Sequence, residues 1–162
     1  MCVCLFKLKM EGFKALDLVK AYEKIAGAKA ILVCTKGAKE GQYNVTPIGW
    51  FTTYDYEPVT KVLFVSDPTH QAALNVHRTK EFAICVPADE KDPIIEKCGS
   101  VSSPDADKFA QFSIKGVPAE KIDVKLLPEN SKVMLELKLA RVITEGSVEI
   151  FMGETVAAWE KA

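Results

Sequence analysis

The segment from residue 132 to residue 144, KVMLELKLARVIT, constrains the fold more than any other part of the chain. Apolar side chains occupy every second position, namely Val133, Leu135, Leu137 and Leu139. Successive residues of a strand point to opposite faces, so this alternation predicts a strand with one buried face and one exposed face. Residues 145 and 146, Glu-Gly, are expected to turn the chain. Residues 147–159 then form the closing strand, in which Gly153 marks a bulge or the close approach of another group.

The rest of the chain is predicted to contain short strands and short helices. The strands are expected at residues 28–35, 44–53, 58–66 and 81–88, and the helices at 17–26, 68–79, 91–100 and 105–112. Six or so strands with inserted helices favour a small closed barrel with helices packed around it. A chain of 162 residues, 48% of them hydrophobic, can bury one core without disulfides or metals. We therefore expect a mainly β protein with one domain over residues 1–162.

Charge and composition exclude several classes of protein. The chain has 21 basic and 22 acidic residues, a formal net charge of −1, which argues against a general nucleic-acid binder. No segment has the ~20 apolar residues that a membrane span needs, and the start of the chain lacks the pattern of a signal peptide. The expectation is a soluble, cytoplasmic protein.

The five cysteines do not have the spacing of a disulfide framework, so reduced thiols are expected. Cys2 and Cys4 form a C-x-C pair that could bind a metal. A second pair of ligands is missing, and thiols packed by chance are the simpler interpretation. No metal site is predicted.

Residues 44–53, NVTPIGWFTT, are an unusual strand. Pro47 removes a ladder donor, and Gly49 weakens the pleat while allowing another group to approach the backbone. In one continuous strand, alternate residues share a face, namely Asn44, Thr46, Ile48, Trp50 and Thr52. An amide, two hydroxyls and an indole suit a planar, polar ligand better than a hydrophobic core. Trp50 could equally be a core or interface residue.

A second candidate site lies where the strand at 58–66 ends. Ser66 and Thr69 flank a tight turn at Asp67 and Pro68, and a helix is expected to start near His70. Hydroxyls together with the unpaired N–H groups of a helix start can bind an anion such as a phosphate. The alternative is that these hydroxyls only cap the helix.

The sequence contains none of the motifs G-x-G-x-x-G, G-x-S-x-G and H-E-x-x-H. Nothing in it supports hydrolysis, and no catalytic side chain is predicted.

Four motifs occur in an order that resembles a known family. They are NVTPIGW, SDPTHQAALNVHRTKEFAICVP, DADKF and GSVEIFMGETV, all within residues 28–157. This order is similar to that of the flavin reductase-like, FMN-binding split-barrel proteins, and among them to the flavoredoxins. The resemblance implies a split β-barrel that binds FMN.

The resemblance also implies a set of cofactor-binding residues. It puts the lysine of the Asp-Lys-Phe motif, Lys108, near the flavin as its cation, where the sequence alone would give a surface lysine. Asn75 could reach the cofactor or lie on the solvent face of its helix. The complete predicted set is Asn44, Thr46, Pro47, Ile48, Gly49, Trp50, Thr52, Ser66, Thr69, Asn75 and Lys108.

The implied function is electron transfer or flavin reduction, as in a flavoredoxin-like oxidoreductase. The alternatives are a strict NAD(P)H:flavin oxidoreductase, a flavin-binding sensor without turnover, and a small barrel that binds a partner but no flavin. The resemblance further implies a homodimer with FMN in a groove between the subunits, and either NAD(P)H or a redox protein as electron donor.

Three positions depart from the family's pattern. Gly49 stands where relatives often have a second Ser or Thr, and Glu57 stands where they often have Pro before a second Pro. Val148 occupies the position of a histidine in the closing strand of many relatives. The last departure puts a nicotinamide contact in doubt.

Overall fold

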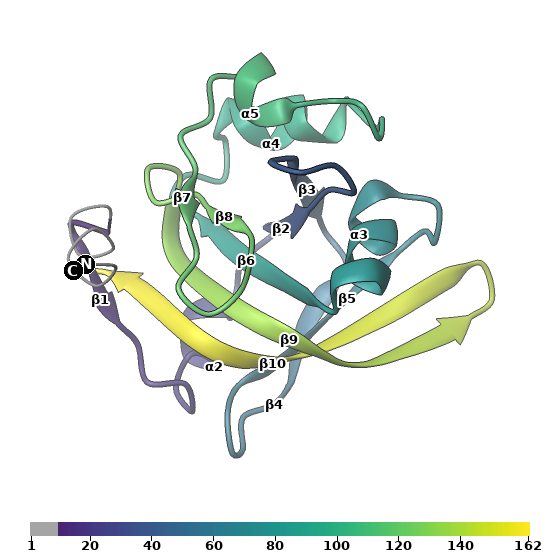
Figure 1. Ribbon diagram of the computed structural model, residues 1–162. Helices are drawn as coiled ribbons and strands as arrows, with labels where there is room; N and C mark the ends of the chain where they lie inside the picture. The colour runs from purple at the N-terminus through teal and green to yellow at the C-terminus, as the bar shows by residue number, and fades with distance from the viewer. Residues whose placement is uncertain (1–9) are drawn as a thin grey trace.

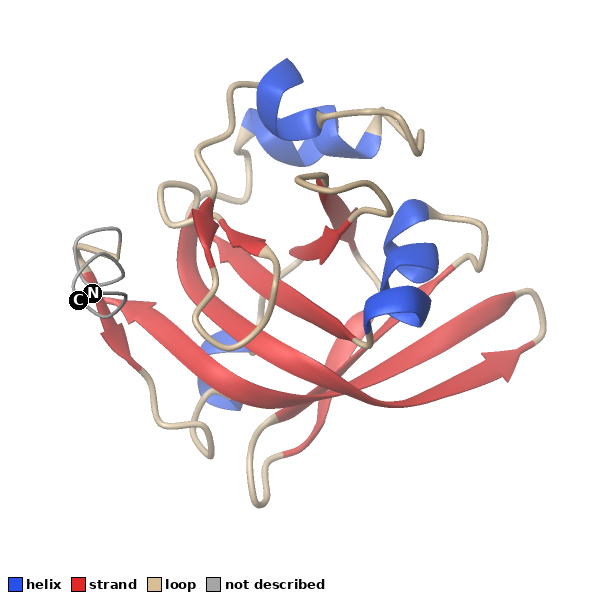
Figure 2. Ribbon diagram, in the orientation of Figure 1, coloured by secondary structure: helices blue, strands red, loops and turns tan. Residues whose placement is uncertain are grey.

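The computed structural model describes residues 10–162, which are organised around one strongly curved antiparallel sheet (Figures 1 and 2). Its strands are hydrogen-bonded in the order β3-β2-β6-β9-β10-β5-β4, and the short β1 pairs with β10. The strand bounds are β1 (Phe13–Ala15), β2 (Ile31–Lys36), β3 (Tyr43–Ile48), β4 (Phe51–Asp55), β5 (Lys61–Ser66), β6 (Glu81–Pro87), β9 (Ser131–Glu145) and β10 (Val148–Lys161). The predicted mainly β class is confirmed. Cys2 and Cys4 lie outside the described residues.

Four short helices and a small ribbon complete the described chain. The helices are α2 (Tyr22–Ile25), α3 (Gln71–Thr79), α4 (Pro93–Gly99) and α5 (Lys108–Gln111), and the ribbon pairs β7 (Val117–Pro118) with β8 (Lys125–Leu126). Three of the helices, α3, α4 and α5, contact β3 at the edge of the sheet (Figure 1). Within residues 10–162, no helix has the length and apolar character needed to cross a membrane.

The segment at 44–53 is not one strand, as the sequence predicted, but two. The chain bends at Gly49 and Trp50, so that β3 pairs with β2 and β4 pairs with β5. β3 and β4 are therefore consecutive in the chain but lie at opposite ends of the hydrogen-bonded order. The sheet has to curl to bring these ends together, yet no strand pairing joins β3 to β4 in the described residues. The barrel is split, as the resemblance implied, and not closed, as the strand pattern alone suggested.

The inside of the barrel holds an aromatic cluster. Phe64 of β5 stacks on Phe151 of β10 with ring centroids 5.0 Å apart, and it meets Phe82 of β6 edge to face at 5.1 Å. All three side chains are fully buried. Aromatic pairs with such geometry stabilise a core beyond their buried area. This cluster joins strands that are distant in the sequence, and so fixes the curvature of the sheet.

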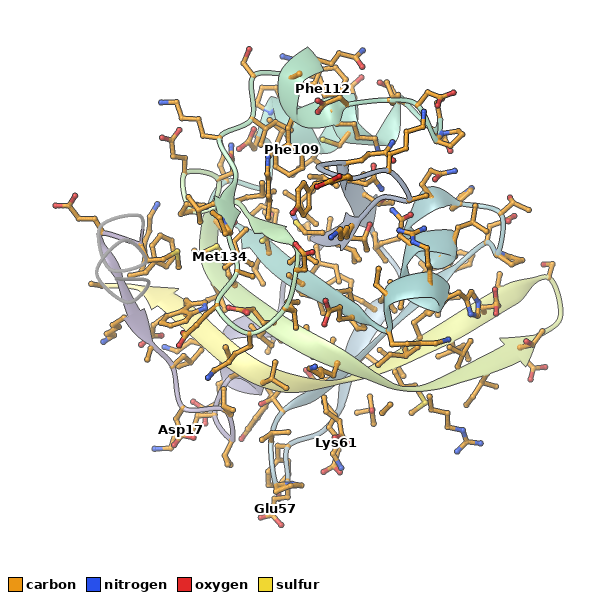
Figure 3. The ribbon with its side chains drawn as sticks, in the orientation of Figure 1. Asp17, Glu57, Lys61, Phe109, Phe112 and Met134 are labelled. Carbon is orange, nitrogen blue, oxygen red and sulfur yellow. The ribbon has the colours of Figure 1, made fainter. Side chains whose placement is uncertain are left out.

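A second apolar layer covers the outer face of β2, β6 and the first half of β9. It includes Cys34, Cys85 and Met134 from these strands and Phe109 from α5 (Figure 3 labels Phe109 and Met134). Because both faces are covered, the first half of β9 is not half-buried as predicted. Its residues 133–137 are all buried, including the carboxylate of Glu136.

The predicted helix at 17–26 is reduced to one turn, α2. The carboxylate of Asp17 accepts a hydrogen bond from the Val19 N–H at 3.0 Å, which favours a turn at this point. The Tyr22 N–H donates to the hydroxyl of Thr60 at 3.0 Å, and this bond joins the start of α2 to the connection between β4 and β5. The start of α2 is therefore fixed by a hydrogen bond to a residue 38 positions away, and not by the hydrogen bonds of a longer helix.

Gly153 lies at a register shift between β9 and β10, which confirms the predicted bulge. A Cβ atom at this position would lie 2.6 Å from Cζ of Phe82 and 3.2 Å from Cβ of Leu137. The close approach to the aromatic cluster therefore requires glycine.

We expect Gly153→Ala to lower the free energy of unfolding by about 1–3 kcal/mol, because overpacking displaces Phe82 or the strand. Chemical denaturation followed by circular dichroism measures this loss. Gly49→Ala is the matched control, since no atom lies within 4 Å of a Cβ placed there. An unchanged unfolding free energy for Gly153→Ala would contradict the packing described here.

Candidate functional site

A cavity of about 460 Å³ opens at the edge of the barrel, where the two ends of the sheet approach each other. Its wall comes from the end of β3 and the bend after it, the end of β5, the start of α3, the end of α4 with the loop that follows, α5, and the first residue of β10. Its volume falls in the range of about 300–1,000 Å³ that is usual for small-molecule sites. Figure 1 shows how α3, α4 and β3 converge on this side of the molecule.

Residues 46–50 form one wall of the cavity. Thr46, Pro47 and Ile48 end β3, and Gly49 and Trp50 form the bend. The space around the missing Cβ of Gly49 is open, so a ligand can approach the backbone here. The side chain of Trp50 is 69% exposed, so it is not the core residue that the sequence left as an alternative.

Lys108 supplies the positive charge of the cavity. It is only 3% exposed, and its Nζ donates to the carbonyl oxygen of Val45 at 2.7 Å. Burial lowers the pKa of this lysine, and the nearby Cys98 acts weakly in the opposite direction. The preceding Asp107 uses its carboxylate to cap α5 by accepting from the Ala110 N–H at 3.0 Å. No carboxylate within residues 10–162 forms an ion pair with Lys108.

The start of α3 lies on the same cavity wall. Its N-cap residue is His70, and no side chain caps the helix. The hydroxyl of Ser66 is buried near this end and donates to the Asp67 carbonyl at 3.1 Å. The capping role that the sequence left open for Ser66 and Thr69 is therefore not what the structure shows. The uncapped N–H groups of the first turn remain available to an anion.

Thr69 is held in the turn instead. Its N–H and its hydroxyl both donate to Asp67 Oδ1, at 2.8 and 2.6 Å. The Thr69 hydroxyl and then the Thr69 N–H lower the pKa of Asp67. Asp67 lines the cavity, but these bonds turn its carboxylate toward its own loop.

The structure brings seven of the eleven predicted residues to the cavity and leaves four away from it. The seven that line it are Thr46, Pro47, Ile48, Gly49, Trp50, Ser66 and Lys108. The four that do not are Asn44, Thr52, Thr69 and Asn75.

Apart from Thr69, three of the predicted residues do not line the cavity, and each of them lies in a different environment. Asn44 is buried and donates to the Thr46 hydroxyl at 3.0 Å, so it orients a cavity residue. Asn75 is also buried and donates to the Thr35 hydroxyl at 3.0 Å. It therefore does not lie on the solvent face of α3. Thr52 lies beyond the bend, at a separate hollow of about 270 Å³ lined also by residues of α2.

The sequence reasoning did not assign several residues of the wall to the site. They are Val65, Asp67, Gln71, Cys98, Gly99, Val101, Ser102 and Val148. The serine-rich stretch at 100–103 was a usable signal, because it precedes the Asp-Lys-Phe motif and is rich in donors. Val148 was noticed only as a departure from the family's pattern.

A split barrel with a cavity at its sheet edges, a buried lysine and an open helix start defines a class of small ligand-binding β protein. The family model described as "Flavin reductase like domain" matches residues 26–162, and the chain belongs to this family. No curated protein sequence matches the chain significantly.

Solved structures agree with the fold. An FMN-binding domain of a flavin reductases-like enzyme from Shewanella baltica is 22% identical, with a TM-score of 0.77 over 92% of this chain and 77% of that chain. Flavoredoxin of Desulfovibrio vulgaris is 21% identical, with a TM-score of 0.72 over 81% of this chain and 68% of its own. The NADH:FAD oxidoreductase of Streptomyces globisporus is 20% identical, with a TM-score of 0.71 over 81% of this chain and 74% of that chain.

Proposed function

We propose that this protein binds FMN in the cavity and acts in electron transfer or flavin reduction, as a flavoredoxin does. The observation that carries the proposal is Lys108, a buried ammonium group without a carboxylate partner in residues 10–162, in the same cavity as an uncapped helix start. Burying a charge is costly unless an opposite charge accompanies it. A ligand with a phosphate group supplies that charge.

The donor set fits FMN. Lys108, the first-turn N–H groups of α3 and the hydroxyl of Ser66, once it rotates away from the Asp67 carbonyl, would hold the phosphate, since charge-assisted and backbone donors suit its oxygens. The Thr46 hydroxyl and the open backbone at Gly49 would meet the polar edge of the ring, and the exposed indole of Trp50 would pack against it. When bound, the flavin supplies the redox chemistry, and the protein binds and orients it. This division of roles requires no acid–base side chain.

The test is to add FMN to the purified protein, record the absorption of the bound flavin, and follow its bleaching by NADH, NADPH and a reduced ferredoxin-type carrier. Uptake of FMN followed by bleaching supports the proposal. Failure to take up FMN at micromolar concentration would favour a barrel that binds no flavin. Uptake without bleaching by any of the three donors would favour a flavin-binding module without turnover.

We also propose a homodimer. On the outer face of the barrel, Leu63 and Val65 of β5 lie opposite Met152 and Ile150 of β10, and all four are only partly buried. Trp50 adds a large exposed apolar surface next to the cavity. A second copy would cover this face and help to enclose the ligand.

Light scattering is expected to give the mass of a dimer at micromolar concentration, since obligate interfaces commonly bury more than about 2,000 Å² around an apolar centre. Ile150→Lys should dissociate the dimer and weaken FMN binding. Val19→Lys, which adds the same single charge at an exposed apolar residue before α2, is the matched control. A wild-type monomer that still holds FMN would contradict a shared site.

Val148 favours a protein carrier as electron donor over NAD(P)H. It lies on the cavity wall. The resemblance to the family implies a histidine at this position, and valine offers no hydrogen bond to a nicotinamide. Misplacement by ~1 Å can cost about a hundredfold in rate. Stopped-flow bleaching should therefore be slow with NADH and NADPH and faster with the carrier.

The variant Val148→His is expected to raise the NADH rate by at least about tenfold by restoring an orienting contact, whereas Val148→Leu should not. If wild-type protein were reduced by NADH at about 10 per second, a rate typical of enzymes, the carrier proposal would fail. The protein would then be a strict NAD(P)H:flavin oxidoreductase.

A further inference from the structure

Two buried thiols face each other outside the residues that line the cavity. Cys34 of β2 and Cys85 of β6 are on hydrogen-bonded neighbouring strands, where Cys34 lies opposite Ala83 and Cys85 lies opposite Leu32. Their Sγ atoms are 3.8 Å apart, and neither residue has exposed surface. Both are free thiols in the structure. The proposed FMN site does not use this pair.

The surroundings of the two sulfurs differ. For Cys34, the hydrogen bond with Cys85 and then burial raise the pKa, so this thiol keeps its proton. Burial also opposes ionisation of Cys85, but the hydrogen bond with Cys34, together with the nearby Leu127 backbone and Ser131 hydroxyl, outweighs it and lowers the pKa. The buried hydroxyl of Ser131 has no hydrogen-bond partner in residues 10–162. Cys85 is thus the sulfur that ionises first.

We propose that Cys34 and Cys85 are a redox-active dithiol that hydrogen peroxide converts to an intramolecular disulfide. The thiolate of Cys85 attacks one peroxide oxygen, the O–O bond breaks, and hydroxide leaves and takes up a proton to form water. The Cys34 sulfur then attacks the Cys85 sulfenic acid, the S–S bond forms, and a second water leaves. Two thiols are oxidised, one peroxide is reduced to two waters, and a reducing thiol reverses the change.

The geometry makes this step accessible. A disulfide bond is about 2.05 Å long, so from a separation of 3.8 Å each sulfur has to move by just under ~1 Å. Because Cys34 and Cys85 are diagonal and not opposite in the ladder, β2 and β6 also have to shift relative to each other, and β2 can shift because its other neighbour β3 is an edge strand. Local opening at such an edge also admits a molecule little larger than water.

The dithiol is connected to the cavity through the β2–β3 ladder. Cys34 lies opposite Val45, and the carbonyl oxygen of Val45 accepts the hydrogen bond from Lys108 Nζ. Movement of Cys34 toward Cys85 pulls on the strand that holds the lysine. Disulfide formation is therefore expected to weaken anion binding in the cavity by about tenfold, which corresponds to ~1.4 kcal/mol.

The test uses the full chain with Cys2, Cys4 and Cys98 replaced by serine, so that only Cys34 and Cys85 remain. Millimolar peroxide should remove both free thiols, and mass spectrometry should show the loss of two hydrogen atoms with no cross-linked dimer. Dithiothreitol should restore both thiols. In the same background, Cys34→Ser should leave Cys85 with an added oxygen instead, and Ser131→Ala should slow the reaction. Circular dichroism before oxidation checks that each variant is folded.

Persistence of both thiols in peroxide, or oxygen addition without loss of hydrogen when Cys34 is present, would overturn the dithiol. Titration of oxidised and reduced protein with FMN tests the connection to the cavity, and this readout rests on the proposed function. A disulfide that forms but leaves FMN affinity unchanged would overturn the connection alone. If FMN does not bind to either form, the proposed function fails while the disulfide result stands.

Discussion

Replacing Lys108 by alanine should weaken FMN binding by about ten- to a hundredfold, because a hydrogen bond to a charged group contributes about 1.5–3 kcal/mol. Riboflavin, which lacks the phosphate, should bind the variant nearly as well as it binds the wild type. Lys108 is buried and is the only lysine on the cavity wall in residues 10–162, so no neighbour can replace its charge. Flavin fluorescence titrations with both ligands measure the difference.

Two controls separate charge from packing. Lys108→Met keeps most of the apolar stem but removes the ammonium group, so it should resemble Lys108→Ala in its preference between FMN and riboflavin. In the wild type, burial lowers the Lys108 pKa, so the charge is lost at a lower pH than in an exposed lysine. FMN affinity should therefore fall as the pH rises through that pKa, and riboflavin affinity should not follow. If both ligands weaken equally in Lys108→Ala, the lysine supports the cavity wall and does not bind the phosphate.

The second large effect concerns stability. Glu136→Ala should lower the free energy of unfolding by about 3–5 kcal/mol, because removing one partner of a buried charged network leaves several donors unsatisfied. The fully buried Glu136 carboxylate accepts hydrogen bonds from the N–H groups of Glu120 and Lys121, at 3.1 and 2.6 Å. It also accepts from the indole Nε1 of Trp159 at 3.0 Å. These bonds attach the loop before β8 and the last strand to the centre of the sheet.

Urea denaturation followed by circular dichroism measures this effect. Glu136→Gln is the matched control, because the amide keeps the shape and one acceptor oxygen, and its loss of stability should be smaller. Glu136 does not line the cavity, so FMN affinity of the folded variant should be unchanged. A loss below about 1 kcal/mol for Glu136→Ala would mean that water satisfies the donors as well as the carboxylate does.

The long hairpin was predictable because its signal is local. The alternation from Val133 to Leu139, the turn at Glu145 and Gly146, and the bulge at Gly153 all follow from residues within a few positions of one another. Burial of Glu136 was not predictable in the same way. Alternation places a glutamate on the solvent face, and the distant loop at 119–124 and Trp159 of β10 cover it.

The bend at Gly49 and Trp50 also depends on residues that are distant in the sequence. Proline and glycine in residues 44–53 indicated an unusual strand, but the pairing partners decide that it is two strands. Val33 lies opposite Thr46, whereas Leu63 lies opposite Thr52, so the two halves belong to opposite edges of the sheet. The ten residues themselves do not indicate which strands they pair with. The predicted common face therefore ends at Ile48.

For the candidate site, the sequence located the residues that are close to a local signal. The bend after β3 and the turn after Ser66 were found from glycine, proline and hydroxyl positions. Lys108 was singled out only through the resemblance to the family, because its burial depends on the packing of α5 against β3. Asn75 was misplaced because its partner Thr35 is 40 residues away.

Binding of a flavin through its phosphate is tested most directly by a comparison of two ligands. Wild-type protein is titrated with FMN and with riboflavin under the same conditions, and flavin fluorescence gives both dissociation constants. FMN should bind at least about tenfold more tightly than riboflavin, since the phosphate gains at least one charge-assisted bond. Equal dissociation constants, or no binding of either flavin, would contradict it.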